Sequence, residues 1–305
     1  MDMCVRNTKQ CLFLLFSIIA IVSCNKKEAS YIESFEYIES YTKWQVDRKQ
    51  ELETTWLPLR GLFFLKEGKQ WVGTDSLLAI QFPADLGIDS LLEVELTPDS
   101  LIITPLSDKI KYKDSLFSDP VSWARSPDFD PSWFEVGAYK FYFLKRGNSI
   151  GIRLRTILNG TWDEYGGIET FPVRDEWVKK AMITYYDQPI TTVISNSAGM
   201  EVETEFLGQI TFDHNGSEYV FDVLDNGDGR LFLIIADQSN GDSTYGGGRY
   251  MYIPRPEEGE EFLLDLNKLH TPPCAYTEFA TCPFPPKQNR LNLEINAGEK
   301  FQSKF

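Results

Sequence analysis

Hydrophobic and polar residues alternate with a period of two over most of the chain after Trp56. The alternation is clearest in Leu92–Leu96 and Ile150–Leu154, where every second residue is aliphatic. A period of two places alternate side chains on opposite faces of a β-strand, so each segment predicts a strand with one buried face. Further strands are predicted at 138–144, 180–186, 190–195, 219–224, 231–236 and 249–253.

Turn residues separate these predicted strands. Asn215-Gly216 lies between two of them and supplies the positive φ values that a tight hairpin needs, and Gly227 and Gly229 do the same before the strand at 231–236. Many short strands joined by turns favour an antiparallel β-sandwich or a barrel-like domain over a nucleotide-binding α/β fold.

A helical period occurs near the N-terminus. Ser30 and Glu33 have the spacing of a capping box, and apolar residues recur every three positions from Ile32 to Tyr41. We therefore predict one amphipathic helix over 30–55. Its apolar stripe must pack against the domain or against a partner, and we favour the domain.

The first 23 residues have the layout of a bacterial export signal. Two basic residues precede a short apolar run from Cys11 to Val22, and a serine and Cys24 follow it. The run is too short to span a bilayer as a helix, so residues 1–23 are predicted to be a lipoprotein signal peptide. Cys24 would then carry the lipid and anchor the protein to the membrane of the cell envelope, with 24–29 as a tether. The tether contains Lys26-Lys27 instead of acidic residues, which favours the periplasmic side over the cell surface.

Residues 56–305 are predicted to form the β-rich domain. A chain of 305 residues with 14% aromatic residues can bury one large core or two smaller ones. The weakly patterned, proline-containing stretch 108–133 allows a division into two sub-domains.

The chain is acidic, with a formal net charge of −15. A surface of this sign repels phosphates, so nucleic acid is excluded as a partner. The simplest explanation of the negative charge is that it keeps the protein soluble.

Two thiols remain beyond the lipid-bearing cysteine, Cys274 and Cys282. An even pair outside the cytoplasm predicts a disulfide, with unpaired packed thiols as the alternative. A zinc site is disfavoured because only His270 lies nearby in the sequence, and a nucleophilic cysteine would need a base and an orienting group. No cofactor and no metal are expected.

The C-terminal third carries the most distinctive residues. They are Thr244–Tyr250 with its three glycines, Asp265-Leu266-Asn267, Pro272–Tyr276, Cys282-Pro283 and Asn289-Arg290-Leu291. Together these residues resemble a bacterial family known as domain of unknown function 1684, and the resemblance extends from about Lys43 to Lys300. It implies a shared fold and brings no settled activity.

Turn residues, aromatic rings and polar side chains cluster in the same third of the chain. The glycine run has no phosphate-loop lysine after it, so a bent hairpin is its simpler meaning. Arg249 could bind a ligand or form an ion pair with Asp237 or Asp265. The candidate ligand-binding residues are Arg249, Tyr245, Tyr250, Asp265, Asn267, Tyr276, Asn289 and Arg290.

The sequence contains no decisive catalytic motif. We favour a non-enzymatic, membrane-anchored module that binds a small polar molecule or a neutral glycan. One alternative is a glycan hydrolase that uses Asp237 and Asp265, with Glu299 as a further carboxylate. The other is a structural lipoprotein whose helix docks on another subunit, which exposure of Phe35 and Ile38 would favour.

Overall fold

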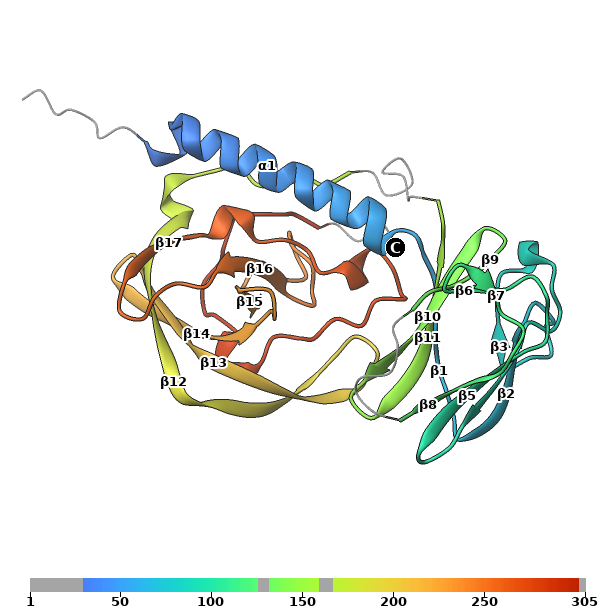
Figure 1. Cartoon of the computed structure of the whole chain (residues 1–305). Coiled ribbons are helices and arrows are strands. Elements are labelled where there is room, and N and C mark those ends of the chain that lie inside the picture. Colours follow the sequence, from blue (N-terminus) through green and yellow to red (C-terminus); the bar gives the residue numbers. More distant parts are fainter. Residues whose placement is uncertain (1–29, 126–131, 159–166, 302–305) are drawn as a thin grey trace, which may run out of the picture.

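A computed structural model describes residues 30–125, 132–158 and 167–301, and this part of the chain is mainly antiparallel β-sheet with one long helix (Figure 1). Two sheets form the first unit. One has the order β1-β11-β10-β9-β6-β7, with β1 Leu59–Phe64, β6 Lys111–Tyr112, β7 Ser115–Leu116, β9 Phe134–Val136, β10 Tyr139–Arg146 and β11 Ser149–Thr156. The other has the order β3-β2-β4-β5-β8, with β2 Gly68–Gly73, β3 Ile80–Gln81, β4 Leu92–Leu96, β5 Ser100–Pro105 and β8 Val121–Ala124.

These two sheets enclose one hydrophobic core and thus form a β-sandwich. Val94 of one sheet and Phe141 and Ile152 of the other are completely buried in the same cluster. Full burial of a side chain of this size contributes about 1.5–3 kcal/mol. The predicted period of two and the predicted antiparallel β-rich fold are confirmed here.

A third sheet forms the second unit and curls into a nearly closed barrel (Figure 1). Its order is β16-β15-β14-β13-β12-β17, with β12 Val178–Ser195, β13 Glu201–His214, β14 Ser217–Asp225, β15 Arg230–Ile235, β16 Arg249–Pro254 and β17 Glu261–Asp265. The barrel has its own apolar core, which includes Ile210, Phe221 and Leu233.

Two strands predicted separately, at 180–186 and 190–195, form the single strand β12. The register with β13 shifts between Tyr185 and Ile190, where Pro189 lacks the N–H group that a regular ladder needs. This irregularity lets one strand bend around the barrel. The predicted hairpin at Asn215-Gly216 is confirmed, because both residues have positive φ between the paired His214 and Ser217.

The helix begins later than predicted. A short turn, η1 (Tyr31–Glu33), precedes α1 (Phe35–Glu51), and one π-helical turn, η2 (Leu52–Trp56), follows. The N-cap of α1 is Ser34, whose hydroxyl accepts a hydrogen bond from the Tyr37 N–H at 3.2 Å. Ser30 does not cap the helix, because its hydroxyl donates to the carboxylate of Asp175 in the second unit.

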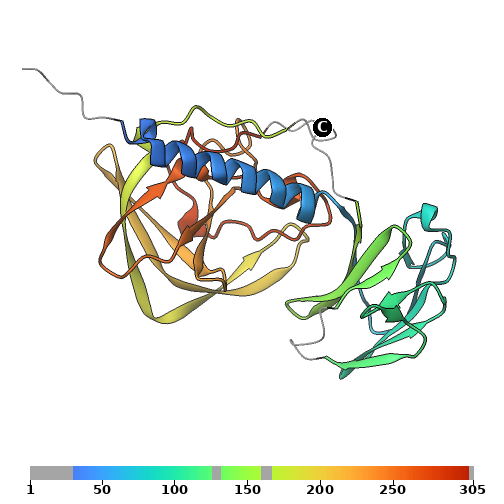
Figure 2. The same ribbon diagram turned by 45° about the horizontal axis from the view of Figure 1, so that its top comes forward.

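Helix α1 lies across the barrel, and the extended segment 167–174 runs beside it (Figures 1 and 2). The buried residues of α1 are Tyr37, Tyr41 and Arg48. Phe35 and Ile38, which were expected to pack inward, are 79% and 53% exposed. The other short helical turns are η3 Ala84–Leu86, η5 Asp175–Trp177, η6 Leu266–Lys268, η7 Pro273–Ala275 and η8 Lys287–Asn289.

The change from sandwich to barrel comes between Thr156 and Val178. The stretch 108–133, where the sequence allowed a division, contributes β6, β7 and β8 to the sandwich. None of the helices within the described ranges is long and apolar enough to cross a membrane. The predicted signal peptide, Cys24 and the tether lie outside the described residues.

Candidate functional site

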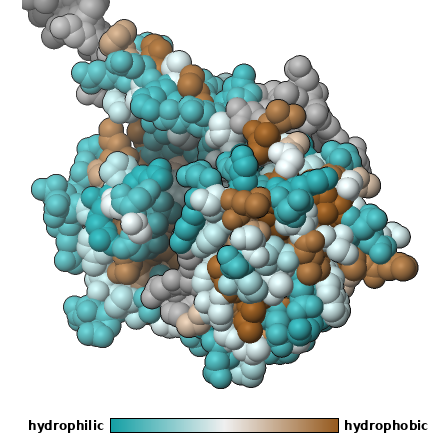
Figure 3. All heavy atoms as spheres, turned by 45° about the vertical axis from the view of Figure 1, so that its right-hand side comes forward, coloured by the Kyte–Doolittle hydropathy of each residue, from teal (hydrophilic) through white to brown (hydrophobic). Residues whose placement is uncertain are grey.

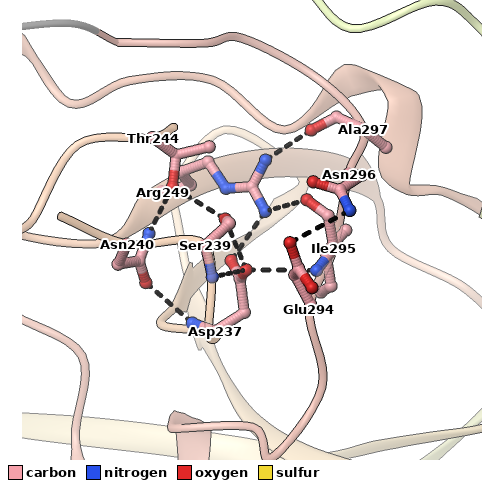
Figure 4. A network of polar contacts seen from close by, with 9 residues as sticks. All are labelled: Asp237, Ser239, Asn240, Thr244, Arg249, Glu294, Ile295, Asn296 and Ala297. Atoms are coloured by element: carbon pink, nitrogen blue, oxygen red, sulfur yellow. Dashed lines mark hydrogen bonds and ion pairs between the residues drawn. The ribbon is translucent and has the colours of Figure 1, made fainter. Parts of the chain in front are cut away.

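Arg249 lies at the centre of a buried polar network (Figure 4). Its guanidinium donates to Asp237 at 2.6 Å and to the carbonyl of Ile295 at 2.9 Å, and it also donates to the carbonyl of Ala297. The side chains of Arg249 and Asp237 are both 0% exposed. Of the two ion pairs that the sequence allowed, the structure therefore contains the one with Asp237, and the arginine that was predicted to hold a ligand is enclosed by protein.

Asp237 is satisfied on all sides by the same network. Its second carboxylate oxygen accepts hydrogen bonds from the N–H and hydroxyl of Ser239, at 2.9 and 2.6 Å, and from the N–H of Ile295 at 3.2 Å. A carboxylate held in this way cannot face a glycosidic bond. The network instead ties the β15–β16 connection to the C-terminal segment.

Asp265, the other carboxylate of the hydrolase hypothesis, stabilises the local turn η6. It is the N-cap of η6 and accepts hydrogen bonds from the N–H and side-chain amide of Asn267, at 3.2 and 2.9 Å. The hydroxyl of Tyr37 donates to it at 3.3 Å, and Lys268 lies 3.5 Å away. A carboxylate whose hydrogen bonds stabilise a turn in this way is not available as a catalytic group.

Four more predicted ligand residues do not come together around a cavity. Asn267 bonds the backbone of Arg174, and the hydroxyl of Tyr250 donates to the carbonyl of Pro283 at 2.7 Å. The amide of Asn289 bonds the N–H and carbonyl of Asp222 and the carbonyl of Ile234. These three side chains are buried supports of the fold, whereas Arg290 is exposed.

The predicted disulfide is not formed, since Cys274 and Cys282 are both free thiols. A hydrogen bond closes the loop instead, since the Cys274 N–H donates to the Cys282 sulfur at 3.1 Å. The Cys282 N–H donates outside the loop, to the Ser197 hydroxyl at 2.9 Å. A hydrogen bond from the Cys282 thiol lowers the pKa of Cys274 to about 7. The hydroxyl of Tyr245 lies 3.7 Å from the Cys274 sulfur.

A pocket of about 290 Å³ lies between α1 and the segment that precedes β12. Its lining residues are Trp44, Gln45, Arg48, Lys49, Gly167, Ile168, Thr170 and Glu299. They come from the first helix, from the segment that runs beside it and from the C-terminal segment. Both ends of the described chain therefore contribute to one cavity.

A buried ion pair borders this pocket. Arg48 donates to Glu299 at 3.0 Å, to Glu51 at 3.0 Å and to the carbonyl of Thr271 at 2.6 Å. Burial alone would lower the pKa of Arg48, but Glu299 and Glu51 beside it raise that pKa above its ordinary value. Arg48 therefore keeps its positive charge, and the carboxylates of Glu299 and Glu51 balance that charge.

Glu299 is held as firmly as its partner. Its second oxygen accepts hydrogen bonds from the Thr271 N–H at 2.7 Å and from the Tyr276 hydroxyl at 3.4 Å. Burial and the charge of Glu299 raise the pKa of Tyr276, so this hydroxyl keeps its proton. Of the eight predicted ligand residues, Tyr276 is the one that contacts the border of this pocket.

Sequence reasoning missed Trp44 and Arg48. The missed signal is the helical spacing of Tyr37, Tyr41 and Arg48, which places a charged residue on the buried face of α1. An arginine on the apolar face of a helix needs a buried carboxylate, and Glu299 is that carboxylate.

Comparisons with known proteins give three findings. A solution NMR structure of an uncharacterized protein from Haloarcula marismortui is 26% identical, covers 47% of this chain and 80% of its own, and superposes with a TM-score of 0.40. A search of the curated proteins finds no match. Residues 163–300, which carry the barrel, match the family model described as protein of unknown function (DUF1684), and the resemblance predicted from Lys43 to Lys300 is confirmed over the matched residues.

Proposed function

We propose that this protein is a lipid-anchored envelope module that binds a small neutral polar molecule, such as one sugar unit of a glycan, in the pocket beside α1. The observation that carries the proposal is the combination of lining groups. Trp44 offers a flat aromatic surface, and Gln45 and Thr170 offer an amide and a hydroxyl. An aromatic surface beside a few polar groups is typical of small-molecule sites.

The charges favour a neutral ligand. Arg48 is already paired with Glu299 and Glu51, and Lys49 lies 3.8 Å from Glu53, so the cations beside the pocket have carboxylate partners. The net charge of −15 also repels acidic glycans. A volume of about 290 Å³ is at the lower end for ligand sites, which suits a single ring.

The test is calorimetric titration of the protein with a panel of neutral mono- and disaccharides. We expect at least one sugar to bind, and Trp44→Ala to weaken its binding by about tenfold or more through loss of the stacking surface. Trp71→Ala is the matched control, because Trp71 is 44% exposed on the sandwich and does not line the pocket. Equal binding by parent and Trp44→Ala, or no binding by any sugar, would contradict the proposal.

The anchor needs its own test. Metabolic labelling with a radioactive fatty acid should mark the parent protein, and Cys24→Ser should remove the label and release the protein from the membrane fraction. Protease added to intact cells should leave the protein uncut if it faces the periplasm. An unlabelled parent that fractionates like Cys24→Ser would rule out lipidation.

Subunit docking is the second candidate, and the exposure of Phe35 and Ile38 on the outer face of α1 favours it. The double variant Phe35→Ser/Ile38→Ser should then lose a cross-linked partner that the parent captures in cells. Leu77→Ser is the control, because Leu77 is 91% exposed on the sandwich. Identical cross-linking by all three proteins would exclude this surface.

A further inference from the structure

Two neighbouring arginines on the sandwich, Arg146 of β10 and Arg153 of β11, have no carboxylate partner within ion-pair distance among the described residues. The buried arginines elsewhere, Arg48 and Arg249, each have a carboxylate at 3.0 Å or closer. Arg146 and Arg153 thus form a local positive region on an acidic protein.

The strand pattern points these arginines away from the sandwich core. Phe141 and Phe143 of β10 and Ile152 of β11 are buried in that core, so the alternate residues face the other side of the sheet. On that side, Arg153 donates to the carbonyl of Phe279 at 3.3 Å and Arg146 donates to the hydroxyl of Thr281 at 3.4 Å. Arg146 and Arg153 therefore face the barrel unit across the junction of the two units.

The guanidinium groups at this junction are left with neutral acceptors. Arg153 is 5% exposed, and its Nε atom has no hydrogen-bond partner. Arg146 stays in contact with solvent, but partial desolvation and the charge of Arg153 lower the pKa of Arg146. Two like charges without a counter-charge are unfavourable, and a bound anion would relieve both.

A pocket of about 260 Å³ opens beside Arg146, and most of its walls are apolar. Its apolar lining residues are Ile194, Val202, Leu224, Phe232, Ile234 and Pro283. Arg146, Thr281, Asn196 and Thr204 are its polar lining residues. On the face shown in Figure 3, hydrophobic residues occur in small groups among hydrophilic ones. The pocket differs from these groups because its apolar residues gather around one arginine.

We propose that this junction is a second binding site, which takes an amphipathic carboxylate of medium chain length. The carboxylate would accept hydrogen bonds from the guanidinium of Arg146, with Arg153 behind it, and the hydrocarbon chain would lie against the apolar walls. The polar pocket beside α1 has no part in this site. An anion suits the arginine fork, and the apolar lining excludes a fully hydrated one.

The test is calorimetric titration of the protein with decanoate below its micelle-forming concentration. Arg146→Gln and Val202→Phe should each weaken decanoate binding by about tenfold or more, because the first removes the charge and the second fills the pocket. Arg174→Gln and Val193→Phe are the matched controls. Arg174 is an exposed cation paired with Glu176, and Val193 is 54% exposed on the neighbouring strand, so both should bind like the parent.

Two further ligands define the class. Decanol and sulfate should each bind at least about tenfold more weakly than decanoate. Decanol lacks the carboxylate, and sulfate lacks the hydrocarbon chain. Equal binding of decanol, equal binding of sulfate, or no binding of decanoate would each overturn the proposal. Val202→Phe leaves the charge in place and keeps the test decisive if Arg146→Gln does not fold.

Discussion

The guanidinium of Arg48 and the carboxylate of Glu299 are 251 positions apart in the sequence and 3.0 Å apart in the structure. Their side chains are 3% and 0% exposed, so the contact is fully shielded from water. It joins the first long helix to the last described segment, on the border of the pocket beside α1. The position of α1 on the barrel, and with it the shape of that pocket, depends on this pair.

Replacement of Glu299 by glutamine should lower the free energy of unfolding by about 3 kcal/mol, because it leaves the Arg48 charge buried with one partly exposed partner, Glu51. Urea unfolding followed by tryptophan fluorescence measures the change. Glutamine keeps the shape and one acceptor oxygen, so the loss reports the charge together with the hydrogen bond that the other oxygen accepts.

Two comparison variants separate the ion pair from general damage. Glu51→Gln should cost about 1 kcal/mol or less, because Glu51 is 39% exposed. The double variant Arg48→Met/Glu299→Leu should recover most of the stability lost in Glu299→Gln, since it removes both charges. Equal losses for Glu51→Gln and Glu299→Gln would show that burial of the pair does not matter.

His270 predicts a loss of stability in mild acid. Burial lowers the pKa of His270 well below its ordinary value of 6.5. In the unfolded chain the imidazole takes up a proton as the pH falls below 6.5, whereas the folded protein keeps it neutral. Stability should therefore fall between about pH 6.5 and pH 5, with a limiting slope of about 1.4 kcal/mol per pH unit.

The chain contains two histidines, so the contribution of each to the pH dependence of stability can be measured with one substitution. His270→Gln should flatten the pH dependence of the urea midpoint between pH 5 and 7, whatever it does to stability at pH 7. His214→Gln should change the slope less, because His214 lies at a partly exposed hairpin. An unchanged slope in His270→Gln would mean that the imidazole titrates normally in the folded protein.

The strands could be predicted from sequence because alternation is a local property. Leu92–Leu96 and the Asn215-Gly216 turn carry their own structure, since side-chain direction and positive φ depend on neighbouring residues. The join of 180–186 and 190–195 into one bent strand could not be predicted, because it depends on the register with β13. Strand pairing is set by contacts between distant segments.

The candidate site was harder to predict for the same reason. Arg249, Asn267 and Asn289 looked like ligand residues because Arg and Asn are good hydrogen-bonding groups, but backbone groups far away in the chain occupy them. Burial decides between a support and a ligand contact, and burial is a property of the whole fold. The pocket beside α1 joins residues from both ends of the described chain, so no local motif marks it.

Gly248 marks a position where the backbone, not a ligand, requires glycine. Its φ is +90°, and an added Cβ would lie 2.5 Å from Pro285 and 2.8 Å from the carbonyl oxygen of Ile235. Gly248→Ala should therefore lower the free energy of unfolding by about 2–4 kcal/mol. At Gly246 the nearest atom would be 3.8 Å away, so Gly246→Ala should change stability by about 0.5 kcal/mol or less. Similar urea midpoints for the two variants would contradict this assignment.

Cys274 should be the reactive thiol of the pair. The hydrogen bond from Cys282 lowers the pKa of Cys274 to about 7 from an ordinary 9.0, whereas that hydrogen bond and burial raise the pKa of Cys282. The thiolate is the nucleophile, so the rate of Cys274 alkylation by iodoacetamide should be half-maximal near pH 7, measured by mass spectrometry of the tryptic peptides. Cys282 is 3% exposed and should stay unmodified. Cys282→Ala removes the donor and should move the Cys274 midpoint up by about one pH unit or more, whereas a parent midpoint near pH 9 would show that the two thiols do not interact.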